Sequence, residues 1–363
     1  MKVCILSVVE MKHMVMSSMY LEYFKDREIE CDIIYLDRYH AQESANANRV
    51  YRVECPRLGV LSKLLGYVKF ICFSKKILKK NQYDFIVVWN EYTAVLFSGF
   101  LRRKFPKKYS INIRDLFNEE SVIKNPRVLN PILAKSLSKS LFSTVSSEKY
   151  LEHLPHCDNW FFVHSINNKI LPQNRIYIDN CNVPKPIQIL YIGKIGYYEE
   201  INILMNALCN DRRFLLKFVG VGSEKVKKYA DYISCTNVEF VGKFESDKTV
   251  GYLQEADIIY NVYGNKRICE RTALSNKMYY AACLNVPILV CKNTYMYEVA
   301  KRCGIGFAVD HCDSSALPDS LFNWFINIDR TASKQKCKAF IKDALESQKK
   351  LYDYMDSIFC EKM

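Results

Sequence analysis

A chain of 363 residues is longer than one hydrophobic core usually supports, so we expect two domains. Its composition, 49% hydrophobic and 25% charged, excludes an intrinsically disordered chain. The net charge of +13 is not accompanied by a recognised nucleic-acid-binding motif, so no nucleic-acid partner is expected.

The N-terminal stretch MKVCILSVVE predicts a first β-strand, because its apolar run is too short for a signal peptide. No apolar run approaches the roughly 20 residues needed to span a bilayer. The 15 cysteines are scattered, odd in number and without a C-x-x-C pair, which predicts buried free thiols in a reducing compartment. We therefore expect a cytoplasmic protein, either soluble or peripheral at the inner face of a membrane.

Two neighbouring segments concentrate positive charge in the first half. Residues 61–80, LSKLLGYVKFICFSKKILKK, contain six lysines and no acid, and their helical spacing predicts one apolar and one basic face. Residues 101–108, LRRKFPKK, add five cations. A solvated helix face explains such a run, and so does contact with an anionic inner leaflet, so both interpretations stay open. The lysines that would face the membrane are Lys75, Lys76, Lys79 and Lys80.

Alternating apolar runs and helical periodicity predict a first domain over residues 1–170. Its predicted strands are 2–9, 31–36, 84–89, 109–113, 141–145 and 159–164. Its predicted helices are 13–26, 61–80, 92–103 and 127–140. The polar, proline-bearing stretch 167–186 that follows is typical of an interdomain linker.

A second series of the same kind predicts a second domain over residues 183–330. Its predicted strands are 187–192, 213–219, 237–241, 257–262, 286–290 and 305–309. Its predicted helices are 199–209, 223–233, 248–256, 275–284 and 295–302. The last segment, 331–363, is predicted to form a helix that packs back across both domains.

Near-continuous apolar strands that alternate with helices indicate parallel sheets covered on both faces. The predicted fold class is therefore α/β, with two doubly wound, Rossmann-like domains facing each other across a cleft. Ligands of such sheets bind beyond the carboxyl ends of the strands.

Successive strand ends of the second half carry residues suited to an anion. Gly193–Gly196 and Gly220–Ser223 each follow a predicted strand, the cation-bearing stretch 263–271 follows another, and Ser275–Lys277 begins a helix. Glycines let the backbone approach a ligand, and helix starts offer unpaired N–H groups. Ser275 alone is explained as an N-cap. Together these features predict a phosphate-bearing ligand.

A family resemblance rests on stretches from both halves. In the second half these are ILYIGKIGYYEEINILMNAL, FVGVGSE, NVEFVGKFESDKTVGYLQEADIIYNVYGN, ALSNKMYYAACLNVPILV and TYMYEVAKRCGIGFAVD, and in the first half, more loosely, YSINIRDLFNEE and LFSTVSSEKYLEHL. On them the chain resembles bacterial glycosyltransferases of the two-domain GT-B fold, specifically the retaining, family 4-like group that builds capsular and other surface polysaccharides. The likeness is specific for fold and reaction class, not for the sugar.

The resemblance implies that the second domain, residues 183–330, binds the nucleotide-sugar, and it implies a role for each matching position there. Lys194 and the amides of Gly193–Gly196 would meet the nucleotide diphosphate. Gly220 and Gly222 would border the base and ribose. The residues implied at the diphosphate or the sugar are Ser275, Asn276 and Lys277.

In the first domain, Asp115 with Arg114 beside it would face the acceptor. The implied catalytic residues are Asp115, Lys194 and Lys277. An aspartate after a strand also commonly caps the next helix, so that interpretation of Asp115 stays open. His164 is predicted at a strand end that faces the cleft, and the six histidines show no metal-ligand spacing.

Two positions depart from the pattern of the group. Tyr280 stands where relatives place an acidic residue at the ribose or sugar, so Tyr280 or Glu270 would take that contact, or the contact is absent. Glu199–Glu200 stands where a second cation often follows the glycine-lysine turn, and Arg267 or Arg271 would replace that cation.

These residues indicate how the departing diphosphate would be stabilised. No D-x-D carboxylate pair occurs, so we expect no metal and no cofactor other than the nucleotide-sugar co-substrate. Cations and helix N-termini aimed at the diphosphate would stabilise it instead. In the retaining group the acceptor hydroxyl attacks from the face that the leaving group vacates, and Asp115 would orient that hydroxyl.

The expected function is transfer of a sugar from a nucleotide-sugar to a lipid-linked glycan. One alternative is a nucleotide-sugar epimerase or hydrolase, which would need an acid/base set, for which the sequence offers Asp115, Glu119 and Glu120. The other is a non-catalytic sugar-nucleotide-binding scaffold subunit, which Tyr280 leaves open.

Overall fold

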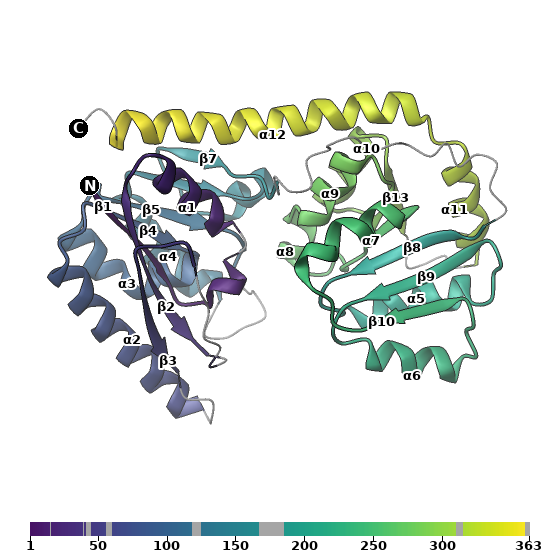
Figure 1. Cartoon of the computed structure of the whole chain (residues 1–363), viewed down its shortest axis with the longest axis horizontal. Helices are drawn as coiled ribbons and strands as arrows, with labels where there is room; N and C mark the ends of the chain where they lie inside the picture. The colour runs from purple at the N-terminus through teal and green to yellow at the C-terminus, as the bar shows by residue number, and fades with distance from the viewer. Residues whose placement is uncertain are drawn as a thin grey trace. The chain divides into compact units, whose positions relative to one another are not determined.

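The computed structural model describes residues 1–14, 16–38, 40, 45–55, 60–117, 125–166, 185–309 and 315–359. The chain divides into two compact units (Figure 1). The first unit is Met1–His164 with Glu346–Met363, and the second is Ser165–Leu345. The domain limits predicted at 170 and 183, and nearly all of the predicted linker, lie outside the described residues.

The first unit is built on a seven-stranded sheet in the order β3-β2-β1-β4-β5-β6-β7, and its paired strands are parallel. The strands are β1 (Lys2–Ser7), β2 (Glu30–Asp37), β3 (Arg49–Glu54), β4 (Phe85–Trp89), β5 (Tyr109–Ile113), β6 (Phe142–Val145) and β7 (Trp160–Phe162). The order reverses direction between β1 and β4, as in a doubly wound sheet.

Helices cover both faces of this sheet, because successive side chains of each strand point to opposite faces. One face packs against α2 (Val60–Lys80), α3 (Glu91–Lys104) and α4 (Pro126–Leu137). The other packs against α1 (Ser17–Asp26) and the end of α12 (Arg330–Phe359), through Leu351, Met355 and Phe359. Two short 3-10 helices, Met11–His13 and Glu148–His153, complete the unit.

The second unit contains a six-stranded sheet in the order β10-β9-β8-β11-β12-β13, again with parallel pairs. Its strands are β8 (Ile187–Ile192), β9 (Phe214–Val219), β10 (Val238–Val241), β11 (Ile258–Asn261), β12 (Ile288–Cys291) and β13 (Gly306–Val309). The two parallel sheets with interleaved helices confirm the predicted pair of doubly wound, Rossmann-like domains.

The helices of the second unit also cover two faces. One face packs against α5 (Tyr198–Leu208), α6 (Glu224–Tyr232) and α11 (Leu317–Ile326). The other packs against α7 (Thr249–Glu255), α9 (Asn276–Leu284), α10 (Tyr295–Arg302) and the first half of α12. A 3-10 turn, Ser246–Lys248, precedes α7, and the five-residue α8 (Ile268–Thr272) precedes α9. The sequence patterns did not predict β3, α8 or α11.

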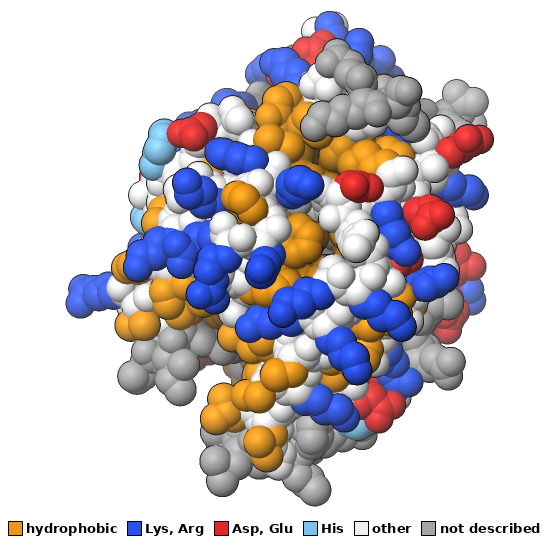
Figure 2. All heavy atoms as spheres, turned by 90° about the vertical axis from the view of Figure 1, so that its left-hand side faces the viewer, with side chains coloured by type: hydrophobic (Ala, Val, Ile, Leu, Met, Phe, Trp, Pro, Cys, Tyr) orange, Lys and Arg blue, Asp and Glu red, His pale blue; other side chains and the backbone are white. Residues whose placement is uncertain are grey.

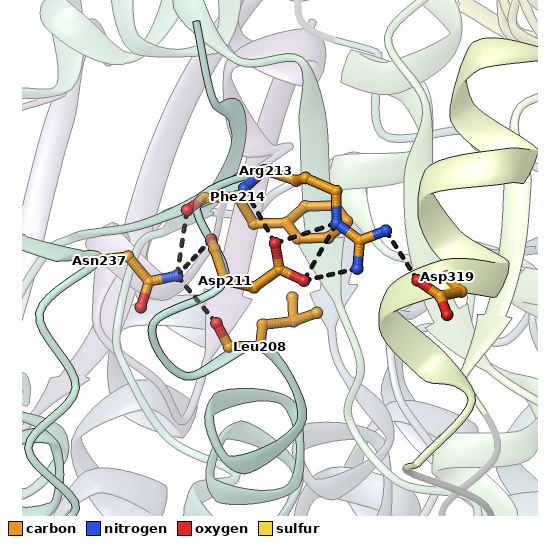
Figure 3. Close-up of polar contacts among 6 residues, drawn as sticks. All are labelled: Leu208, Asp211, Arg213, Phe214, Asn237 and Asp319. Carbon is orange, nitrogen blue, oxygen red and sulfur yellow. Dashed lines mark hydrogen bonds and ion pairs between the residues drawn. The ribbon is translucent and has the colours of Figure 1, made fainter.

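A polar network fixes the start of β9 (Figure 3). The Asn237 side-chain amide donates to the carbonyl oxygens of Leu208, at 2.8 Å, and Phe214, at 3.0 Å, and more weakly to that of Asp211. Arg213 donates to Asp211 and, at 2.7 Å, to Asp319 on α11. These bonds satisfy backbone carbonyls in the turn between α5 and β9, which positions the sheet that carries the site.

Candidate functional site

The strand order of the second unit reverses between β8 and β11. Ligands of doubly wound sheets bind outside the carboxyl ends of the strands at such a reversal. The segments that follow these two strands are 193–197 and 262–267. These segments carry candidate residues, and they lie at the carboxyl ends of the strands, where the sequence predicted a ligand.

The segment after β8 offers open backbone. Gly193 lies at φ +112°, and no atom lies within 4 Å of where a Cβ would stand on Gly193 or Gly196. The segment is tied to the neighbouring loop, because the Ile195 amide donates to the Val221 carbonyl at 2.8 Å. The Lys194 side chain between the glycines is exposed. Backbone and cation are therefore both accessible to a ligand.

Gly220 and Gly222, predicted beside the base and ribose, have a packing role that needs no ligand. Their φ angles are +139° and +97°. A Cβ on Gly220 would stand 1.8 Å from the Gly193 carbonyl oxygen, and one on Gly222 would stand 2.6 Å from that of Ile195. The loop after β9 thus needs glycine to approach the loop after β8.

Ser275 is the N-cap of α9, and its hydroxyl accepts a hydrogen bond from the Lys277 amide at 3.2 Å. Asn276 is the first helical residue. The Lys277 ammonium turns back to the Tyr263 hydroxyl, to which it donates a short hydrogen bond. It also lies 5.1 Å from the Tyr263 ring centre and 5.6 Å from that of Tyr191, within cation–π distance.

Tyrosines that the sequence patterns did not single out surround this lysine. Tyr197 stacks on Tyr263 with ring centres 4.6 Å apart, although Tyr197 itself lies in the left-handed region at φ 58°. Tyr191 stacks on the buried Tyr260 at 5.3 Å. Burial raises the pKa of Tyr191, so its hydroxyl stays protonated at neutral pH. The sequence signal that could have identified two of them is adjacency to a glycine, since Tyr197 follows Gly196 and Tyr263 precedes Gly264.

Arg267 and Arg271, predicted to replace the missing cation, are engaged locally. The Arg267 guanidinium pairs with Glu270, whose side chain is only 8% exposed and also accepts from the amides of Lys266 and Arg267. Arg271 donates to the carbonyl oxygens of Asn265 and Lys266. Both arginines therefore shape the segment before α9, and Glu270 is held by the same contacts.

Lys194 and Lys277 differ from Arg267, which is paired with an acid, and from Arg271, whose guanidinium is bonded to backbone carbonyl oxygens. Among the residues that the structure describes, no ion pair joins either lysine to a carboxylate. Glu199, in contrast, pairs with Lys266 at 3.2 Å. Tyr280, which stands at the position of the expected acid, packs partly buried against the apolar core under α9. The two lysines therefore remain as charge for an anion.

The first-unit candidates follow β5. Asp115 is exposed and accepts a hydrogen bond from the Leu116 amide at 3.1 Å, which is a local turn contact. Arg114 donates to the Val163 carbonyl at 3.1 Å. Burial, and then the charge of Arg114, lower the pKa of His164 to about 4. Arg114 thus interacts electrostatically with His164. Glu119 and Glu120 lie outside the described residues.

The exposed face of α2 differs from the face that the sequence predicted. Leu64, Leu65 and Val68 are 60%, 68% and 50% exposed, whereas Phe70 and Leu78 are buried. At helical spacing these exposed apolar residues share a face with the lysines of the same helix: Lys69, Lys75, Lys76, Lys79 and Lys80. Figure 2 shows this side of the first unit, with Lys and Arg spread among hydrophobic side chains. The prediction of separate apolar and basic faces was wrong.

No helix within the described ranges is both long enough and apolar enough to cross a membrane.

No protein-family model and no curated protein matches the chain. Sucrose-phosphate synthase from Thermosynechococcus elongatus is similar in structure, with a TM-score of 0.72, 14% identity, and coverage of 98% of this chain and 99% of that one. The Anabaena protein HepE in complex with UDP has a TM-score of 0.69 at 13% identity, covering 98% and 100%. A Listeria monocytogenes protein assigned as a UDP-N-acetylglucosamine 2-epimerase has a TM-score of 0.67 at 11% identity, covering 99% and 97%.

These likenesses show the fold. The chain has the two-domain GT-B fold, as predicted, and that fold is shared by glycosyltransferases and by the epimerase.

We predict that Gly220→Ala destabilises the protein by at least about 2 kcal/mol, because of the backbone clash and the positive φ. Gly196→Ala is the matched control, since open space surrounds its Cβ position, and it should stay within about 0.5 kcal/mol. Urea unfolding followed by circular dichroism measures both. Equal stability of the two variants would contradict the described approach of the two loops.

The lowered pKa of His164 predicts a pH effect. In the unfolded chain the imidazole takes up its proton near pH 6.5, whereas in the folded chain it does so only near pH 4. Stability should therefore fall as the pH drops from 6.5 to 4, by up to about 1.4 kcal/mol per unit. His164→Asn should remove this slope. An NMR titration of His164 with a midpoint near 6.5 would refute the prediction.

Proposed function

We propose that this protein is a glycosyltransferase that takes a sugar from a nucleotide-sugar donor. The observation that carries the proposal is the pair of lysines, Lys194 and Lys277, at the strand-order reversal of a GT-B fold, with no carboxylate paired to either among the described residues. Cations in that position suit a diphosphate.

The backbone around the lysines supports a diphosphate as the ligand. The open space at Gly193 and Gly196 would let oxygen atoms reach the backbone. The start of α9 adds helix N–H groups and the positive end of a helix dipole, although Ser275 already caps one amide. HepE, which has the same fold, was crystallised with UDP, and this supports a nucleotide diphosphate here.

In the proposed reaction, negative charge builds up on the departing diphosphate as the bond to the sugar breaks. Lys194 and Lys277 would stabilise that charge without a metal ion, because preorganised cations cost no reorganisation during the reaction. We propose retention of configuration, with the acceptor hydroxyl passing its proton to the leaving phosphate. Asp115, exposed at the end of β5, would orient that hydroxyl.

We further propose a lipid-linked glycan as the acceptor, in capsule or other surface polysaccharide synthesis, with the protein peripheral at the inner leaflet. The exposed face of α2 supports this, since its leucines and valine offer apolar area and its lysines offer charge to an anionic surface. No acidic residue interrupts α2.

An epimerase is the second candidate, because the Listeria protein has the same fold. The two activities differ in product. A transferase releases free nucleotide only when an acceptor is present, whereas an epimerase changes the sugar with no acceptor. Incubation with UDP-, GDP- and CMP-sugars, with and without a lipid-diphosphate acceptor, separates them. Binding of a donor without either reaction would indicate the scaffold subunit.

Replacing either lysine should weaken nucleotide binding. We expect Lys194→Ala and Lys277→Ala each to raise the dissociation constant of the preferred nucleotide diphosphate at least about tenfold, as for the loss of a charge-assisted hydrogen bond. Isothermal titration calorimetry measures this, and Lys243→Ala, an exposed lysine of the same unit, is the control. Unchanged affinity in both site variants would refute the assigned site.

Charge reversal on α2 should reduce membrane binding. The variant Lys75→Glu, Lys76→Glu, Lys79→Glu, Lys80→Glu is expected to lose most co-sedimentation with phosphatidylserine-containing vesicles, because each lysine near the surface contributes about 1 kcal/mol. The matched control reverses four lysines of the second unit: Lys227, Lys228, Lys243 and Lys248. If both variants sediment like the wild type, the exposed face of α2 is simply solvated.

A further inference from the structure

Tyr191 holds the segment that carries Lys194. Its hydroxyl lies 3.2 Å from the carbonyl oxygen of Lys194 and 3.4 Å from that of Gly196, and it donates to them. The same hydroxyl accepts a hydrogen bond from the Gly196 amide at 3.3 Å. Tyr191 belongs to the rigid strand β8 and is buried. The Tyr191 phenol therefore fastens the open glycine segment to the sheet, in addition to the bonds that join Ile195 to the Val221 carbonyl and to the Tyr198 hydroxyl.

Tyr263 holds Lys277 in a corresponding way. The Tyr263 hydroxyl accepts a hydrogen bond from the Lys277 ammonium. The Tyr263 ring is in turn fixed by stacking on Tyr197, with an angle of 17° between the rings. An ammonium group has three N–H donors, so the bond to Tyr263 leaves two for an anion.

The chemistry of the two phenols suits positioning rather than proton transfer. Burial raises the pKa of Tyr191. A neutral phenol can accept from one group and donate to another at once, which fixes a flexible segment without cancelling a lysine charge. A carboxylate in the same place would compete with a phosphate for the cation.

We propose that Tyr191 and Tyr263 are positioning residues for a diphosphate, Tyr191 acting through the Lys194 segment and Tyr263 acting through Lys277. This inference rests on the proposed function, since it assigns supporting residues to the same site. Neither tyrosine is required to touch the ligand. Each lowers the cost of binding by holding its lysine in place beforehand.

The test uses the full chain and UDP, with affinity measured by calorimetry. Tyr191→Phe and Tyr263→Phe keep each ring and remove each hydroxyl, and each should weaken UDP binding about 3- to 10-fold. Tyr260→Phe is the matched control. Its hydroxyl is buried in the same cluster, and among the described residues it has no hydrogen-bond partner, so its removal should leave UDP affinity within about twofold.

Double variants identify which lysine each phenol serves. The loss caused by Tyr263→Phe should vanish in a Lys277→Ala background and persist in a Lys194→Ala background. The loss caused by Tyr191→Phe should shrink with Lys194→Ala and persist with Lys277→Ala. A general structural defect would weaken binding equally in both backgrounds.

The outcomes separate the two levels of the proposal. If the lysine variants bind UDP and the other nucleotide diphosphates like the wild type, the proposed site itself fails. If the lysine variants lose affinity but Tyr191→Phe and Tyr263→Phe behave like Tyr260→Phe, only the positioning role is overturned. Tyr263 is less buried than Tyr191. If Tyr191→Phe folds poorly, Tyr263→Phe therefore still tests the positioning role.

Discussion

Two ammonium groups at one edge of a parallel sheet are the feature on which the proposed chemistry depends. Lys194 follows β8 directly, whereas Lys277 reaches the same sheet edge from the first turn of α9. Tyr191 contacts both lysines, because its hydroxyl is hydrogen-bonded to the Lys194 backbone and its ring centre lies 5.6 Å from the Lys277 ammonium. Nearby, Arg267 is paired with Glu270 and Lys266 with Glu199, whereas Arg271 is bonded to backbone carbonyl oxygens, so the charge proposed for a ligand comes from Lys194 and Lys277.

Backbone geometry, rather than charge, explains the glycines of the site. Gly220 and Gly222 allow the loops after β8 and β9 to approach, whereas Gly193 and Gly196 border open space. The same residue type therefore serves packing at one pair of positions and access at the other. The segment after β8 can therefore contact a ligand, whereas the segment after β9 supports it by packing. Tyr191 then restrains the backbone conformations that Gly193 and Gly196 would otherwise allow.

The alternation of apolar runs and helical periodicity was enough to predict two doubly wound, Rossmann-like domains and most elements to within a few residues, whereas the GT-B fold was implied by the family resemblance. It missed β3, because this edge strand carries exposed Arg49 and half-buried Arg52 in place of an apolar run. It assigned the wrong faces to α2, because apolar residues on an exposed helix face have the same spacing in the sequence as those on a core face. The pairing of Arg267 with Glu270 depends on the turn before α9, which residue spacing alone does not specify.

The central claim is that two linked phosphoryl groups are held by lysines of the second unit, and a series of truncated ligands tests it most directly. Calorimetry with uridine, UMP and UDP, and with the corresponding guanosine and cytidine series, measures what each phosphate adds. For one of the bases, the diphosphate should bind at least about tenfold more tightly than the monophosphate, and this increment should disappear when both Lys194 and Lys277 are alanine. Equal affinities along every series, or an increment unchanged in the double variant, would contradict the claim.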